Sequence, residues 1–133
     1  MTKITVDTNI LVRAMTEDDE HQSKLAETEL AKAEIVAVTI PAICELVWVL
    51  SRGYKIATAD IANAIRRLAD SRNAVVNRPA VEAGLALLEA GADFADGVIA
   101  YDGRWLGAET FVSFDRKAVN LMQAQGDAAR LLT

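Results

Sequence analysis

The segment Thr110-Phe111-Val112-Ser113-Phe114-Asp115 indicates how this chain folds. It is a short run of β-branched and aromatic residues, which favours a β-strand, and an acid follows it directly. Near the start of the chain, Ile4-Thr5-Val6-Asp7 has the same arrangement of a short strand and a terminal Asp. Two such strands separated by helical segments predict an α/β fold, with acids at the carboxyl ends of parallel strands.

Strand-like and helix-like segments alternate along the rest of the chain. Apolar and β-branched runs predict further strands at 35–38, 74–76 and 129–132. Apolar residues at helical spacing, together with Gly and Pro at the ends, predict helices over residues 21–33, 41–53, 59–69, 79–90, 93–101 and 116–125. Short, continuous apolar strands suit a parallel sheet covered on both faces. We therefore predict an α/β fold, a three-layer α/β/α sandwich around a central, mainly parallel sheet.

The composition fits one domain with one core. The chain has 133 residues, of which 52% are hydrophobic, and no linker-like stretch interrupts it, so we expect residues 1–133 to form a single domain. Its single cysteine, Cys44, excludes an internal disulfide and suits a reducing cytoplasm. The sequence has no apolar run of about 18 residues and no secretory pattern after Met1, so we expect a cytoplasmic protein that does not enter the membrane.

The net charge of −5 gives no support for nucleic-acid binding, for which a basic excess is the usual mark. The excess of acids fits a phosphate-binding protein only if the acids gather around a metal site. Bound cations then reverse the sign of the local charge.

Two acids follow predicted strands. Asp7 ends the first strand and Asp115 ends the strand at 110–114, so parallel strands bring both carboxylates to the same edge of the sheet. The alternative for each is a common one, an Asp that caps the following helix.

Glu45 interrupts an otherwise apolar helical stretch, residues 41–50. A helix that is apolar on nearly every side is expected to be buried, and an ionised Glu in it is costly unless it is paired or binds a metal. The alternative is a Glu near the helix start that interacts favourably with the helix dipole.

A second pair of acids opens the helix predicted to begin at Asp93. Asp93 is expected to cap this helix, and Asp96 lies in its first turn, where the dipole favours an acid. We expect Asp96 to point inward beside Ile99 and Ala100, where a carboxylate needs a partner.

Together these acids predict a metal site. No Lys or Arg is obviously placed to pair with them, and convergent carboxylates repel one another. Oxygen ligands without His or Cys select Mg²⁺ or Mn²⁺ over zinc. Such a site would perform metal-assisted phosphoryl chemistry.

These motifs, in this order, resemble the PIN-domain family: Val6-Asp7-Thr8-Asn9, Glu45 in an apolar helix, Asp93-Phe94-Ala95-Asp96 and Ser113-Phe114-Asp115. The length is most similar to that of the VapC toxins of bacterial toxin–antitoxin pairs. The resemblance implies that the catalytic and metal-binding acids are Asp7, Glu45, Asp96 and Asp115. It implies accessory roles for Asp93, Asn9 and Ser113.

The resemblance also implies an activity and partners. The activity is Mg²⁺-dependent endonucleolytic cleavage of structured RNA, transfer or ribosomal RNA, with Mn²⁺ as a substitute ion. The partners are a second copy of the chain in a homodimer and a cognate antitoxin. Arg116 and Lys117 directly follow Asp115, and we expect them to contact RNA phosphates. Gly97 is a departure from the family pattern, in which Ala or another helix former is commoner.

Three other functions compete with this one. The same carboxylates could serve another metal-dependent nuclease or phosphatase that acts on DNA. A binding module could keep the PIN-like fold without catalysis, although the intact acidic set argues against it. A signalling receiver domain needs an acid after a central strand, but Asn77 follows Val75-Val76.

Overall fold

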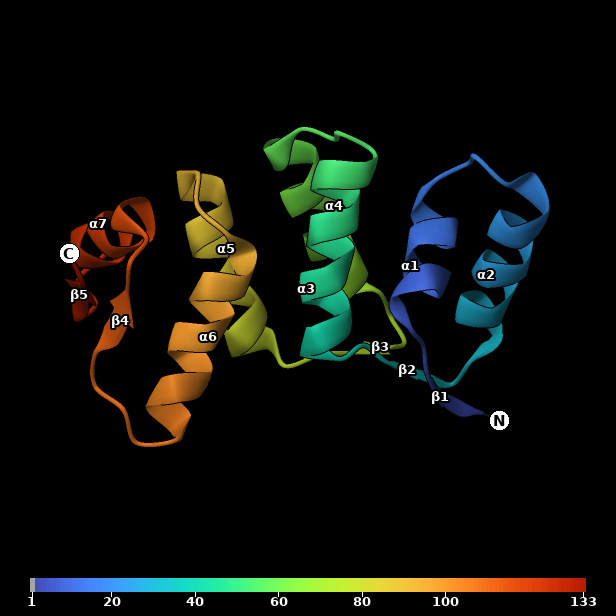
Figure 1. The fold of residues 1–133 in the computed structure, drawn as a ribbon. Coiled ribbons are helices and arrows are strands. Elements are labelled where there is room, and N and C mark those ends of the chain that lie inside the picture. Colours follow the sequence, from blue (N-terminus) through green and yellow to red (C-terminus); the bar gives the residue numbers. More distant parts are fainter. Residues whose placement is uncertain (1) are drawn as a thin grey trace. The chain divides into compact units, whose positions relative to one another are not determined.

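Every strand pair found in residues 2–133, the part of the chain that the computed structural model describes, is parallel. The chain divides into two units, Met1–Asn77 (unit 1) and Arg78–Thr133 (unit 2), each considered by itself. Helices and parallel strands make up both units (Figure 1), so the predicted α/β class is confirmed. That residues 1–133 act as one domain stays a prediction.

Unit 1 contains a three-stranded sheet in the order β1-β2-β3. Its strands are β1 (Lys3–Thr5), β2 (Ile35–Ala37) and β3 (Ala74–Val75). Its α-helices are α1 (Thr8–Met15), α2 (Glu20–Lys32), α3 (Ile40–Trp48) and α4 (Thr58–Asp70). Ile4 of β1 pairs with Val36 of β2, and Val36 in turn pairs with Ala74 of β3.

Unit 2 contains a two-stranded sheet and three helices. Its strands are β4 (Phe111–Ser113) and β5 (Ala129–Leu131), and its helices are α5 (Arg78–Ala90), α6 (Phe94–Trp105) and α7 (Arg116–Ala124). α5 ends at Gly91, as predicted, with a positive φ of 101° that suits glycine. None of the helices in residues 2–133 is long and apolar enough to cross a membrane.

The helix α1 was not predicted from the sequence. It is only eight residues long and contains Ile10 and Val12, whose branched side chains lower helix propensity. It forms because Asp7 caps it, with Asp7 Oδ1 accepting a hydrogen bond of 3.1 Å from the Ile10 amide. Leu11 and Val12 are buried, so packing stabilises the short helix further.

Glycines allow α5 and α6 to pack very closely, and the two helices run side by side in Figure 1. A Cβ on Gly97 of α6 would lie 2.3 Å from the carbonyl oxygen of Ala83 in α5. A Cβ on Gly84 of α5 would lie 2.5 Å from the ring of Phe94, which is itself fully buried. The departure from the family pattern at Gly97 is therefore a packing requirement.

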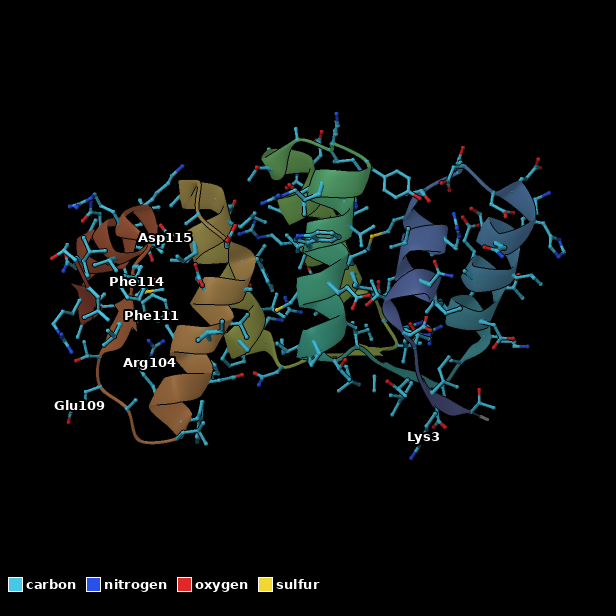
Figure 2. The ribbon with its side chains drawn as sticks, in the orientation of Figure 1. Lys3, Arg104, Glu109, Phe111, Phe114 and Asp115 are labelled. Atoms are coloured by element: carbon cyan, nitrogen blue, oxygen red, sulfur yellow. The ribbon has the colours of Figure 1, made fainter. Side chains whose placement is uncertain are left out.

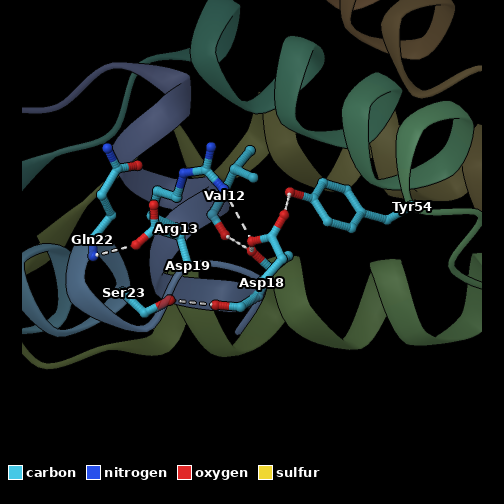
Figure 3. A network of polar contacts seen from close by, with 8 residues as sticks. Val12, Arg13, Asp18, Asp19, Gln22, Ser23 and Tyr54 are labelled. Atoms are coloured by element: carbon cyan, nitrogen blue, oxygen red, sulfur yellow. Dashed lines mark hydrogen bonds and ion pairs between the residues drawn. The ribbon is translucent and has the colours of Figure 1, made fainter.

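The apolar helix in unit 1 does not continue as an α-helix to Gly53. It changes at Val49 into a single π-helical turn, Val49–Gly53. The turn is followed by Tyr54, whose hydroxyl donates a hydrogen bond of 2.7 Å to Asp18 in the loop between α1 and α2 (Figure 3). Arg13 and Thr16 donate to the other oxygen of Asp18, at 2.9 and 3.0 Å. The network ties the loop to the end of the π-helical turn.

We expect Tyr54→Phe to destabilise the protein at neutral pH and to have a smaller effect in acid. The hydrogen bond from Tyr54 is the main cause that holds the pKa of Asp18 below its usual 3.8. A carboxyl with a lowered pKa contributes stability above its unfolded-state pKa, and that stability is lost as the pH falls through the folded-state pKa. Thermal unfolding of both proteins at neutral and at acid pH measures the difference. An equal loss at both pH values would contradict this role, and Tyr101→Phe in unit 2 is the control.

Candidate metal centre

Three carboxylates of unit 2 converge. Asp93, Asp96 and Asp115 each place one carboxylate oxygen within 4.8 Å of the others. Asp93 and Asp96 come from the beginning of α6, and Asp115 lies between β4 and α7. We call these three residues the carboxylate cluster.

The packing of unit 2 brings the beginnings of α6 and α7 together. A small core of Leu87, Ala118 and Met122 joins α5 to α7, with Phe111 of β4 and Ala100 of α6 packed against it. Because α6 is also held against α5, the first turns of α6 and α7 are placed by the same core. Asp93 and Asp96 are three residues apart at a helix start, so their side chains are neighbours.

Asp115 and Asp93 differ in whether their side chains cap the helix that follows. Asp115 caps α7, with Oδ1 accepting a hydrogen bond of 3.1 Å from the Ala118 amide. Asp93 occupies the cap position of α6, but its side chain makes no capping hydrogen bond, contrary to the expectation from the sequence. A carboxylate has two oxygens, so the cap at Asp115 still leaves one oxygen for a ligand.

The electrostatics of the carboxylate cluster favour a bound cation. Burial, and then the negative charges of Asp93 and Asp115, raise the pKa of Asp96 above its usual value. Within residues 2–133, no Lys or Arg forms an ion pair with any of the three acids. The donor set consists of oxygen atoms alone, which fits Mg²⁺ or Mn²⁺.

We expect Asp96 to lower the stability of the metal-free protein as the pH rises above 3.8, the ordinary pKa of an Asp, and Asp96→Asn to remove this contribution. The raised pKa means that Asp96 keeps its proton to higher pH in the folded state than in the unfolded state. The contribution of Asp96 to the free energy of unfolding therefore decreases as the pH rises through its folded-state pKa. Unfolding in EDTA across this pH range tests the expectation, with Asp102→Asn as the control. If Asp96→Asn instead melts below the unmodified protein at neutral pH, Asp96 has a structural role.

Ser113 supports the cluster through the backbone. Its Oγ accepts a hydrogen bond of 2.9 Å from the backbone amide of Asp115. Leu132 donates its amide to the carbonyl of Ser113, at 2.9 Å. The turn that presents Asp115 is therefore fixed on both sides.

Arg116 and Lys117 are exposed in the first turn of α7. The ammonium nitrogen of Lys117 lies 3.2 Å from the position that a Cβ on Gly91 would occupy. Gly91 precedes Asp93 by two residues, so Lys117 places a positive charge beside the α5–α6 turn. Phosphate contact by either residue stays a prediction.

Asp7, Asn9 and Glu45 belong to unit 1. Asp7 caps α1 and Asn9 is exposed in its first turn. Thr8, which is buried, donates its hydroxyl to the carbonyl of Ala42 at 3.3 Å, so the beginning of α1 lies beside the first turn of α3, one turn before Glu45. This buried hydroxyl was not singled out from the sequence, where only its place directly after Asp7 could have indicated it.

The expectation that Glu45 is buried was wrong. Glu45 is exposed and shares one side of α3 with Pro41 and Trp48, which are also exposed. The apolar residues between them, such as Leu46 and Val47, are buried on the opposite side. The cost of a buried charge therefore no longer supports a metal-binding role for Glu45, and the family resemblance alone supports it.

A comparison with known protein families identifies the domain that these two units belong to. The family profile of the PIN domain matches residues 4–121, which includes Asp7, Glu45 and the whole cluster. No curated protein matches the chain.

Proposed function

The chain belongs to the PIN-domain family, and from this premise we propose that it is a Mg²⁺-dependent endoribonuclease acting on structured RNA. PIN domains are typically metal-dependent nucleases, which supports a phosphodiester hydrolase in general. The observation that carries the proposal is the convergence of Asp93, Asp96 and Asp115 without a paired Lys or Arg in the described residues.

The residues of the carboxylate cluster fit a divalent cation. Asp96 and Asp115 would hold it, with Asp93 as an accessory ligand. When bound, a divalent cation offsets the charge of the phosphate and lowers the pKa of a coordinated water. The chain contributes by holding Asp115 in a fixed turn and by keeping Asp96 at the base of a closely packed helix, so the ligands need little reorganisation.

Residues outside the cluster also have roles in this proposal. Arg116 and Lys117 would contact the RNA backbone, because Arg and Lys near a phosphate supply affinity without reading sequence. Asp7 and Glu45 would be required for cleavage and Asn9 would assist them, as the family resemblance implies.

We further propose that the protein is the toxin of a toxin–antitoxin pair, acts in the cytoplasm and forms a homodimer. The resemblance in length to the VapC toxins supports this proposal. Exposed Trp48 also supports it, because large exposed apolar side chains are common where proteins bind partners. Expression of the protein alone should slow growth, and co-expression of the small protein encoded beside it should restore growth. Normal growth of cells in which expression of the protein has been verified would contradict the toxin role.

Incubation of the purified protein with total cellular RNA tests the activity. We expect discrete cleavage products in Mg²⁺ and intact RNA in EDTA or with Asp7→Asn. Single- and double-stranded DNA are run in parallel. Cleavage of DNA but not RNA would favour the alternative nuclease, and the absence of cleavage in every lane would contradict the proposal.

A further inference from the structure

Phe114 is an exposed aromatic residue at the carboxylate cluster. It directly precedes Asp115, and 79% of its surface is accessible. Figure 2 shows the two residues next to each other where β4 leads into α7. The other Phe of this segment, Phe111, packs against the core of unit 2. The core therefore uses one ring of the segment and leaves the other in solvent.

The backbone around Phe114 is held on both sides. Ser113 accepts the amide hydrogen of Asp115, and Asp115 in turn accepts the amide hydrogen of Ala118. Ser113 is also the last residue of β4 and pairs with Leu131 of β5. The ring is thus attached to a fixed turn, and a ligand that packs on it pays little entropy for ordering the backbone.

We propose that Phe114 stacks against an unpaired base of the nucleic acid whose phosphate binds at the carboxylate cluster, an inference that rests on the proposed function. A phosphate at the cluster places the neighbouring nucleotides beside residue 114. A base offers an apolar face of the size of the ring, and such stacking is common in the recognition of single strands.

The proposal specifies a class of substrate. In a duplex, the faces of a base are covered by its neighbours, so only a base in a loop, bulge or single strand can stack on Phe114. The ring has no hydrogen-bonding group, so stacking selects unpaired structure and leaves base identity to other residues.

Other exposed apolar residues of unit 2 provide controls. Trp105 is 77% exposed but lies at the far end of α6, about 14 Å along the helix axis from Asp96 at 1.5 Å per residue. Val112 is 42% exposed in β4, two residues before Phe114. A protein-binding surface at this end of β4 would use both residues, whereas base stacking needs only Phe114.

The test uses a short single-stranded RNA that contains the fluorescent base 2-aminopurine, whose emission is quenched by stacking. The measurement is made in Mg²⁺ in the Asp7→Asn background, in which we expect the RNA to remain intact and the carboxylate cluster is unchanged. We expect Phe114→Ala to bind this RNA about fivefold to 100-fold more weakly and to lose the quenching. Phe114→Trp should retain the affinity and the quenching, whereas Phe114→Leu should lose both. Duplex RNA should bind equally well to Phe114→Ala and to its parent.

Trp105→Ala and Val112→Ser should leave binding and quenching unchanged. Equal quenching in Phe114→Ala and its parent, or an equal loss with Val112→Ser, would overturn the inference, the latter in favour of a protein-binding surface. Because these variants are exposed, their melting temperatures should match that of the parent.

Kinetics and quenching distinguish a wrong stacking role for Phe114 from a wrong proposed function. With Asp7 restored, Phe114→Ala should raise KM for RNA cleavage and change kcat little, since stacking is present before and during reaction. RNA cleavage with an unchanged KM would overturn the stacking role alone. If the unmodified protein cleaves no RNA, the proposed function fails, while the quenching still decides whether Phe114 stacks on a base.

Discussion

Asp96→Asn should reduce the rate of RNA cleavage by more than about 100-fold, the upper range for loss of a group that merely orients a metal ligand. Asp96 is the least exposed member of the carboxylate cluster, and its pKa is raised by burial and by the two neighbouring acids. The substitution retains the shape of the side chain but removes the charge that a cation requires. The rate is measured with the RNA that the unmodified protein cleaves, in saturating Mg²⁺.

Asp102→Asn is the matched control for this prediction. Asp102 is an exposed acid on the same helix, about 9 Å further along its axis at 1.5 Å per residue. It should keep the full cleavage rate. If both variants lose activity equally, general charge rather than the cluster is responsible, and if neither does, the assignment of Asp96 is wrong.

Gly97→Ala should destabilise the protein by about 3 kcal/mol or more, at the upper end of the usual cost of overpacking. The added Cβ would lie 2.3 Å from the carbonyl oxygen of Ala83. A backbone atom of α5 cannot move aside as a flexible side chain can, so the two helices must separate. The loss outweighs the gain of about 1 kcal/mol that Ala brings to a helix interior. Thermal unfolding should show a decrease in Tm on the order of 10 °C.

Gly103→Ala tests the same substitution in the same helix without the close approach. A Cβ there would lie 3.9 Å from the Cβ of Ala108, which is an ordinary contact. We expect the melting temperature to stay the same or to rise. A decrease for Gly103→Ala as large as that for Gly97→Ala would show that the effect comes from the loss of glycine itself.

Most of the fold could be predicted from local patterns. The strand at residues 110–114 and the helix that follows it correspond to β4 and α7, because alternation and a capping Asp are visible in the sequence. The helix α1 could not be predicted, because eight residues that include Ile10 and Val12 have little intrinsic helix propensity. A cap and long-range packing stabilise it, and neither is visible in a local window.

The candidate site could be predicted in part. The sequence places Asp93, Asp96 and Asp115 at a strand end and at helix starts, and these positions do converge in unit 2. Glu45 shows the limit of this reasoning. A stretch with so many apolar residues suggests complete burial, but the spacing of Pro41, Glu45 and Trp48 by four and three residues places them on one exposed side.

Two further features depend on tertiary distances alone. In the sequence, Gly97 only interrupts a helix. The structure shows why glycine is required there, because the carbonyl of Ala83 lies too close for a Cβ. The sequence predicts Phe114 as an apolar strand residue, and only the structure shows that its side chain is exposed and lies outside the core. Exposure of this kind follows from which neighbours pack nearby, and a strand pattern does not contain that information.

The carboxylate cluster is expected to hold a divalent cation. Calorimetric titration of Mn²⁺ into the metal-free protein, into Asp96→Asn and into Asp102→Asn tests this expectation. We predict saturable binding that is retained in Asp102→Asn and lost in Asp96→Asn, and that weakens as the pH falls because protons compete for Asp96. Equal binding by all three proteins, or no binding by the unmodified protein, would contradict this expectation.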